Sequence, residues 1–270
     1  MTPPSVFKRA AGLGLQASGV GLPARATVEA RRLEAGSRTQ PARPCNRHCY
    51  DLAVLTRALI FDFDGLIIDS ETPLFDIWSR LYADHGQVLT LDEWQHALGT
   101  QGGFDPFAHL STLLATTLDR DTLAAFVRDE HWRLCGEQPL LPGIRDRIDE
   151  ARALPLAIAI ASSSASAWVH PWLERHDLMP LFDAVCTRDD VERVKPAPDL
   201  FLLAAERMNV EPAGCVVFED SPNGLRAAHA AGMRAVAVPN HLTRGLPLPD
   251  PHLVLDSMAD MTLGDILARV

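Results

Sequence analysis

Six short apolar runs alternate with helical patterns along the chain, and this alternation limits the fold more than any other feature. The runs are rich in Ile, Val and Ala and read ALIFDFD (58–64), LAIAIAS (156–162), FDAVCT (182–187), CVVFED (215–220), RAVAVP (234–239) and HLVLDS (252–257). Between them, residues 143–153, 198–209 and 221–232 have apolar positions at the three- and four-residue spacing of amphipathic helices. We therefore predict an α/β fold, with a Rossmann-like parallel sheet and helices on both faces.

The segment between the first two runs is too long for a single helical crossover. Residues 71–141 contain helical patterns at 73–86, 90–99, 107–118 and 120–134, and their sequence carries no strand signal. We predict that residues 71–141 form an inserted helical cap domain. The α/β core then consists of residues 57–70 and 142–270.

The first 56 residues differ from the rest in charge. Nine Lys or Arg stand against three acidic residues in positions 1–57, although the whole chain has a formal net charge of −10. Because this segment lacks the apolar residues that would offset its ordering entropy, we predict a basic, disordered leader at residues 1–56. This segment could be a transit peptide, or it could result from an upstream translation start that the cell does not use. Cys45, His48 and Cys49 lack the spacing of a standard zinc pair, and we expect no zinc site there.

Composition excludes several classes of protein. The acidic net charge argues against a nucleic-acid binder that uses a general basic surface. No uninterrupted apolar stretch reaches eighteen residues, so we expect no membrane contact. Five scattered cysteines suit a reducing compartment better than a disulfide framework. We expect a cytoplasmic monomer.

Four carboxylates follow two of the predicted strands. Asp62 and Asp64 end the first run, and Glu219 and Asp220 end the fourth. The C-terminal ends of parallel strands meet at one edge of a sheet, where ligands bind. Carboxylates gathered there repel one another unless a cation sits among them, and hard oxygen ligands favour Mg²⁺. A lone aspartate at a strand end is usually a helix N-cap, but four together favour a metal site.

Lysine is almost absent from this chain. Only Lys8 and Lys195 occur beside 23 arginines, and Lys195 stands directly before a Pro-Ala-Pro turn. A lone lysine is usually a solvated surface residue. Here the turn fixes it ahead of a helix, and a compact ammonium is well suited to lie between a phosphoryl oxygen and a carboxylate.

Taken in order, the motifs DFDG (62–65), ASSS (161–164), KPAPD (195–199) and EDS (219–221), with a helical insert after the first, resemble the four signature motifs of the haloacid dehalogenase superfamily. The insert resembles the cap of the subfamily that includes β-phosphoglucomutase and sugar-phosphate phosphatases. The resemblance covers residues 58–257, about three-quarters of the chain.

The resemblance implies a role for each motif residue. Asp62 would be the nucleophile that forms an aspartyl phosphate, and Asp64 would act as general acid and base. Ser162, with the backbone amide of Ser163, would bind phosphoryl oxygens, and Lys195 would offset the developing charge. The Mg²⁺ ligands would be Asp62, Asp64 through its backbone carbonyl, Glu219 and Asp220.

The resemblance also implies a small phosphorylated metabolite as substrate, with a sugar phosphate favoured. The cap closes over the cavity and selects the leaving group. The residues expected to contact the substrate are Gly65, Glu71, Thr100, Ser163 and Asn223.

Other reactions of the superfamily fit less well. Phosphonate cleavage needs a cap lysine, which residues 71–141 lack, and dehalogenating relatives lack the second aspartate. A mutase of the β-phosphoglucomutase type stays an alternative, although the histidine expected about ten residues after Asp64 is replaced by Leu74. A binding module without turnover is the remaining alternative. The complete set of motif residues argues against it, so phosphomonoester hydrolysis is the favoured prediction.

Overall fold

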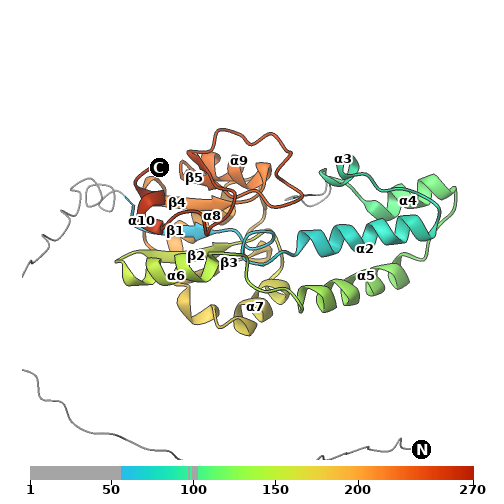
Figure 1. Ribbon diagram of the computed structural model, residues 1–270, viewed down its shortest axis with the longest axis horizontal. Coiled ribbons are helices and arrows are strands. Elements are labelled where there is room, and N and C mark those ends of the chain that lie inside the picture. The colour runs from blue at the N-terminus through green and yellow to red at the C-terminus, as the bar shows by residue number, and fades with distance from the viewer. Residues whose placement is uncertain (1–55, 97, 99–102) are drawn as a thin grey trace, which may run out of the picture. The chain divides into compact units, whose positions relative to one another are not determined.

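The computed structural model describes residues 56–96, 98 and 103–270 (Figure 1). The leader predicted at residues 1–56 therefore lies outside the described residues, apart from Thr56. Thr100 and the candidate zinc residues also lie outside them.

A six-stranded parallel sheet forms the centre of the fold. Its strands are β1 (Ala58–Phe61), β2 (Ala157–Ala161), β3 (Ala184–Cys186), β4 (Cys215–Glu219), β5 (Arg234–Ala237) and β6 (Leu253–Val254), in the order β3-β2-β1-β4-β5-β6. All six fall on the apolar runs of the sequence. The order reverses between β1 and β4, which lie side by side with Phe61 opposite Phe218. A reversal of this kind opens a crevice at the C-terminal edge of the sheet.

Helices cover both faces of the sheet, so the predicted fold class is confirmed. Strand residues alternate between the faces: Leu59 and Phe61 pack with α6 (Ile144–Ala153), α7 (Ser166–Arg175) and α10 (Leu263–Leu267). Ala58 and Ile60 pack on the opposite side with α8 (Asp199–Arg207) and α9 (Pro222–Ala230). Short 3₁₀ turns lie at Met179–Leu181, Arg188–Asp190 and Pro212–Gly214.

Four helices lie between β1 and β2 in the sequence. They are α2 (Glu71–Asp84), α3 (Leu91–Trp94), α4 (Pro106–Leu114) and α5 (Arg120–Cys135), and the described part of this segment contains no strand. They contribute most of a third hydrophobic cluster, which includes Trp78, Tyr82 and Leu110 and is joined by Leu242 from beyond β5. A bridge between Ile68 and Leu140 pairs the two connections to the core. The division into core and cap at residues 71 and 141 stays a prediction.

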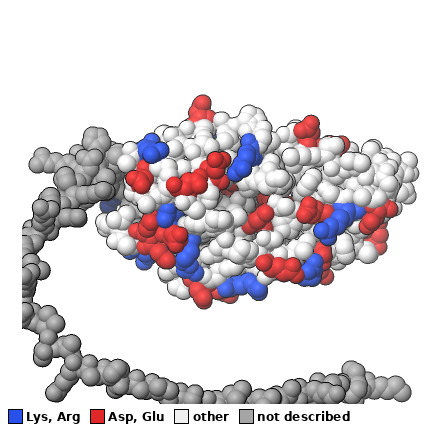
Figure 2. Space-filling model, viewed as in Figure 1, with Lys and Arg blue, Asp and Glu red and all other residues white. Residues whose placement is uncertain are grey.

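Two surface properties bear on the sequence-based expectations. Among the described residues, no helix combines the length and apolar character that a membrane crossing requires. On the face shown in Figure 2, acidic and basic side chains are interspersed and form no extended basic patch.

Stacking between Phe61 and Phe218 joins the two strands that end at the crevice. The rings lie 4.9 Å apart with an interplanar angle of 16°, and both side chains are fully buried. We expect Phe218→Ala to lower the free energy of unfolding by about 3–5 kcal/mol, because it removes buried area and leaves a cavity. Chemical denaturation measures this loss.

Phe126→Ala is the matched control, because the Phe126 side chain is 50% exposed. We expect that variant to change stability by less than about 1 kcal/mol. Equal losses in the two variants would contradict the assignment of Phe218 to the core.

Candidate active site

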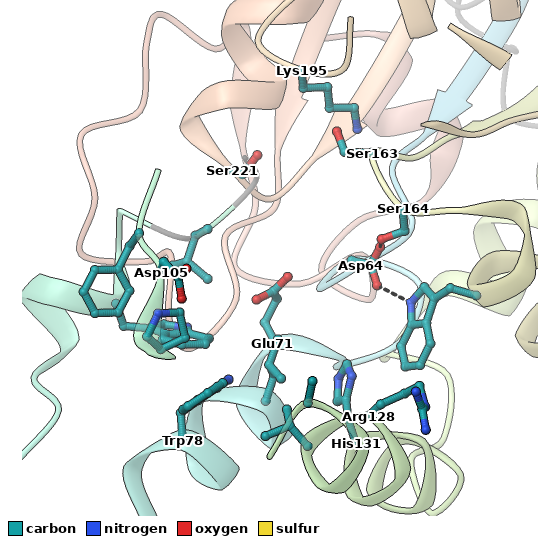
Figure 3. Close-up of a pocket in the computed structure, with 18 of the residues that line it drawn as sticks. Asp64, Glu71, Trp78, Asp105, Arg128, His131, Ser163, Ser164, Lys195 and Ser221 are labelled. Carbon is teal, nitrogen blue, oxygen red and sulfur yellow. Dashed lines mark hydrogen bonds between the residues drawn. The ribbon is translucent and has the colours of Figure 1, made fainter. Parts of the chain in front are cut away.

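A cavity of about 660 Å³ lies at the C-terminal edge of the sheet, between the strand ends and helices α2, α4 and α5 (Figure 3). The core contributes residues that follow β1, β2 and β4, together with Lys195. Except for Lys195, these side chains reach the cavity because they lie at or after the C-terminal end of a parallel strand. The other wall is largely apolar and aromatic, and it includes Leu74 and Trp78.

Three carboxyl groups share one ammonium at the bottom of this cavity. Asp62, Glu219 and Asp220 are buried, and one oxygen from each lies within 4.8 Å of the other two. Lys195, only 3% exposed, donates hydrogen bonds to Asp62 Oδ1 and to Glu219 Oε1, the latter at 2.6 Å. One positive charge therefore faces three acidic groups.

This imbalance alters the protonation of the cluster. Burial raises the pKa of Asp62, and the negative charges of Glu219 and Asp64 add to this against the attraction of Lys195. Burial also raises the pKa of Asp220, with Glu219 and Asp62 adding to the effect. Burial would lower the pKa of Lys195, but attraction to Asp62 and Glu219 outweighs it and raises that pKa. Lys195 therefore stays charged.

The cluster fits a hard divalent cation. Its donors are carboxylate oxygens, which Mg²⁺ and Ca²⁺ prefer, and a second positive charge would offset the burial and the mutual repulsion that raise the pKa of Asp62 and Asp220. The described residues can therefore hold such an ion.

Glu219 is oriented by Ser221, two residues further along the chain, and by Lys195. Its Oε2 accepts hydrogen bonds from the backbone N–H and the hydroxyl of Ser221, both at 3.0 Å, while its Oε1 faces Lys195. Helix α9 passes so close that a Cβ atom at Gly224 would overlap the Glu219 carboxylate. Both oxygens of Glu219 are thus engaged by protein groups.

Asp220 is held by a residue that follows the neighbouring strand. Asn240, just beyond β5, donates from Nδ2 to Asp220 Oδ2 at 2.6 Å and to the carbonyl oxygen of Gly65 at 3.3 Å. Gly65 has φ +76°, and a Cβ atom there would overlap both of these side chains. Glycine is required at this turn because the backbone passes directly over Asp220.

Asp64 has different surroundings from Asp62. Its Oδ1 accepts hydrogen bonds from Ser70 Oγ and Trp168 Nε1, both at 2.8 Å. Its Oδ2 accepts from Ser164 Oγ at 2.6 Å and from Ser162 Oγ at 3.3 Å. Figure 3 shows Asp64 beside Ser164, with the tryptophan hydrogen bond as a dashed line. Neutral donors surround this carboxyl group, whereas Lys195 contacts Asp62.

Glu71 extends from the first turn of α2 into the cavity (Figure 3). Burial raises its pKa from 4.5 to about 8, with further contributions from Asp64, Asp62 and Asp69. The side chain therefore carries a proton at neutral pH in the absence of a cation, and it can donate as well as accept a hydrogen bond.

The structure brings most of the predicted site residues together. Those that line the cavity are Asp62, Asp64, Glu71, Ser163, Lys195, Glu219 and Asp220. Ser162 lies behind Asp64, and Gly65 lies against Asp220. Asn223 is not among the lining residues, because its Nδ2 donates to the carbonyl of Leu98 at 3.3 Å and its Oδ1 accepts from Arg226 at 2.7 Å.

Sequence reasoning missed several residues that touch the site. Asn240 directly follows the run RAVAVP, so the rule that ligands gather after strands could have identified it. Ser70, Ser164 and Trp168 contact Asp64, but these contacts depend on how a loop and helix α7 fold back. Only Ser164 had a signal, because it is the last residue of the ASSS motif.

Comparison with known proteins agrees with this geometry. Residues 59–238 match the family described as haloacid dehalogenase-like hydrolase. YhcW of Bacillus subtilis (strain 168), whose provisional name is that of a phosphatase, is 41% identical over 213 residues, covering 79% of this chain and 97% of the relative. The phosphorylated carbohydrates phosphatase of Thermotoga maritima is 33% identical over 186 residues, covering 66% of this chain and 83% of the relative.

A solved structure supports the same relationship. CbbY from Rhodobacter sphaeroides, determined in complex with xylulose-(1,5)bisphosphate, superposes with a TM-score of 0.62 and 28% sequence identity, covering 76% of this chain and 96% of that one. These matches confirm the resemblance inferred from the four motifs and the prediction of an enzyme of the phosphatase class. The chain belongs to the haloacid dehalogenase-like hydrolase family.

Proposed function

We propose that the chain is a Mg²⁺-dependent phosphomonoester hydrolase that acts on a small phosphorylated metabolite, a sugar phosphate, through an aspartyl-phosphate intermediate. The observation that carries this proposal is the placement of Asp62 against Lys195 and the acidic cluster, with Asp64 at the same cavity in a separate hydrogen-bond network. The name of the Thermotoga maritima relative and the sugar bisphosphate bound to CbbY support a phosphorylated sugar as substrate, and the name of YhcW supports phosphatase activity.

In the first half-reaction, a carboxylate oxygen of Asp62 attacks phosphorus. The bond between phosphorus and the ester oxygen breaks, and the departing oxygen takes the electron pair together with a proton from Asp64. Lys195 stabilises the charge that develops around phosphorus. Ser163 Oγ, which has no hydrogen-bond partner among the described residues, lines the cavity and is available to a phosphoryl oxygen.

In the second half-reaction, a water molecule attacks the phosphorus of the aspartyl phosphate. Asp64, now a carboxylate, accepts a proton from that water, and the electron pair of the breaking bond returns to Asp62. Inorganic phosphate leaves with both aspartates in their starting protonation states. Asp64 thus serves once as acid and once as base.

Mg²⁺, when bound, would neutralise charge on the phosphoryl oxygens and on the cluster. Its protein ligands would be Asp62, Asp220 and the backbone carbonyl of Asp64. Glu219 also belongs to the acidic cluster, but its contacts with Lys195 and Ser221 support a role in orienting the lysine.

The mutase alternative is less well supported. Leu74, which occupies the sequence position where that reaction would place a histidine, lines the cavity with an apolar side chain. A leucine cannot exchange protons with a sugar hydroxyl, so transfer of the phosphoryl group to water is favoured. The cytoplasmic location and the monomeric state stay predictions.

Removal of the nucleophile tests the proposed reaction. We expect Asp62→Asn to lower kcat for 4-nitrophenyl phosphate by several orders of magnitude, because the amide cannot form the phosphoenzyme. A colorimetric assay with added Mg²⁺ measures the loss. Asp84→Asn, at an exposed position of α2, is the control and should retain wild-type activity. Near-normal activity in Asp62→Asn would show that another group attacks phosphorus.

The raised pKa of Glu71 gives a prediction about stability in metal-free buffer. Its pKa is 4.5 ordinarily and about 8 in the folded protein, so ionisation at higher pH disfavours the folded state. We expect Glu71→Gln to become more stable than wild type as pH rises from about 5 to about 8, by about 2–5 kcal/mol, with a constant difference above that. Urea denaturation at several pH values with a chelator present measures this difference. A difference that does not change with pH would contradict the half-buried, carboxylate-rich setting of Glu71.

A further inference from the structure

Trp168 is a large side chain in direct contact with the proposed general acid. Its indole Nε1–H donates to Asp64 Oδ1 at 2.8 Å, beside the hydroxyl of Ser70 on the same oxygen. The opposite oxygen, Oδ2, has contacts only with hydroxyl groups, those of Ser164 and Ser162, among the described residues. The two oxygens of Asp64 therefore have partners of different chemistry.

That difference favours Oδ2 over Oδ1 as the oxygen that carries a proton. An indole N–H is a donor only, whereas a serine hydroxyl can donate or accept. A proton on Oδ1 would weaken the hydrogen bond from Trp168, because a protonated carboxyl oxygen is a poorer acceptor than a carboxylate oxygen. A proton on Oδ2 can instead be donated to Ser164, which lines the cavity, and the Trp168 contact is kept.

Aromatic side chains fix the position of the Trp168 indole. His131 stacks on it with ring centroids 4.6 Å apart and an interplanar angle of 15°. Trp132 and Trp172 meet it edge to face, at 4.9 Å and 5.4 Å. His131 and Trp132 belong to α5, so a helix of the predicted cap holds the indole in place.

His131 also contacts the second donor to Oδ1. Its Nε2 lies 2.7 Å from the carbonyl oxygen of Ser70, and because a carbonyl only accepts, Nε2 carries the hydrogen. Helix α5 thus contacts both residues, Trp168 and Ser70, that donate to Asp64 Oδ1.

We propose that Trp168 is a positioning residue that directs the Asp64 proton to Oδ2, the oxygen that contacts Ser164, for transfer to the leaving oxygen. This inference rests on the proposed function, in which Asp64 is the general acid. It predicts that loss of the Trp168 N–H lowers kcat/KM more for a leaving group that must be protonated than for one that departs without a proton.

Two esters of similar shape differ in whether the leaving group must be protonated. The 4-nitrophenolate of 4-nitrophenyl phosphate departs without a proton, whereas the alkoxide of benzyl phosphate requires one. In Trp168→Phe, which keeps an aromatic ring and removes the N–H, we expect kcat/KM with Mg²⁺ to fall about tenfold or more for benzyl phosphate. For 4-nitrophenyl phosphate we expect a fall of less than about threefold, because general acid catalysis contributes little there.

Trp172→Phe is the matched control. Trp172 lies in the same helix and aromatic cluster, and its Nε1 has no hydrogen-bond partner among the described residues. The ratio of the two kcat/KM values should stay at the wild-type value in this variant. Ser70→Ala removes the other donor to Oδ1 and should change the ratio in the same direction as Trp168→Phe.

The inference is overturned if Trp168→Phe lowers kcat/KM for both esters by the same factor, which indicates a structural role. It is also overturned if kcat/KM falls for neither ester. Circular dichroism checks that the variant is folded. If it is not, Ser70→Ala decides: an unchanged ratio overturns the inference. Wild-type protein that cleaves neither ester with Mg²⁺ would contradict the proposed function itself, so the two failures are distinguishable.

Discussion

The repulsion among three buried carboxyl groups that share one lysine is the constraint on which the site depends. Asp62, Glu219 and Asp220 lie within reach of one cation, and Lys195 supplies one positive charge among them. Taking charges out of water costs free energy that is recovered only through partners. The cluster is therefore stable in its ionised form only with a further positive charge, which links metal binding to the folded state.

The sheet places this repulsion at a position where a ligand can relieve it. Adjacent parallel strands β1 and β4 deliver their acidic residues to the same edge, and the stacked rings of Phe61 and Phe218 fix the two strands relative to each other. Neighbouring backbone then comes very close to the carboxylates, which only glycine permits at Gly65 and Gly224. Packing of the core and geometry of the site are thus determined by the same residues.

Much of this arrangement follows from local sequence. A buried parallel strand needs a run of apolar residues, and its C-terminal end needs polar ones, so the six strands and the carboxylates of Asp62 and Asp220 are visible in the sequence. The hydrogen-bond network around Asp64 is not visible in the sequence, because Trp168 reaches Asp64 only through the packing of α7 against α5. Helix α7 also contains Pro171, which weakens its helical signal. Asn223 instead contacts Leu98, a pairing between distant segments that no spacing indicates.

Thermal unfolding in rising concentrations of Mg²⁺ tests the central claim most directly, with metal-free wild type compared with Asp220→Asn. A ligand that binds only the folded protein stabilises it by about 2.7 kcal/mol at a hundred times its Kd. We predict that the wild-type unfolding temperature rises by several degrees and then saturates. In the variant, which has one buried carboxylate fewer, we predict that the unfolding temperature without metal is at least as high and that the Mg²⁺-dependent rise is largely lost. An equal rise in both proteins, or none in either, would contradict the account.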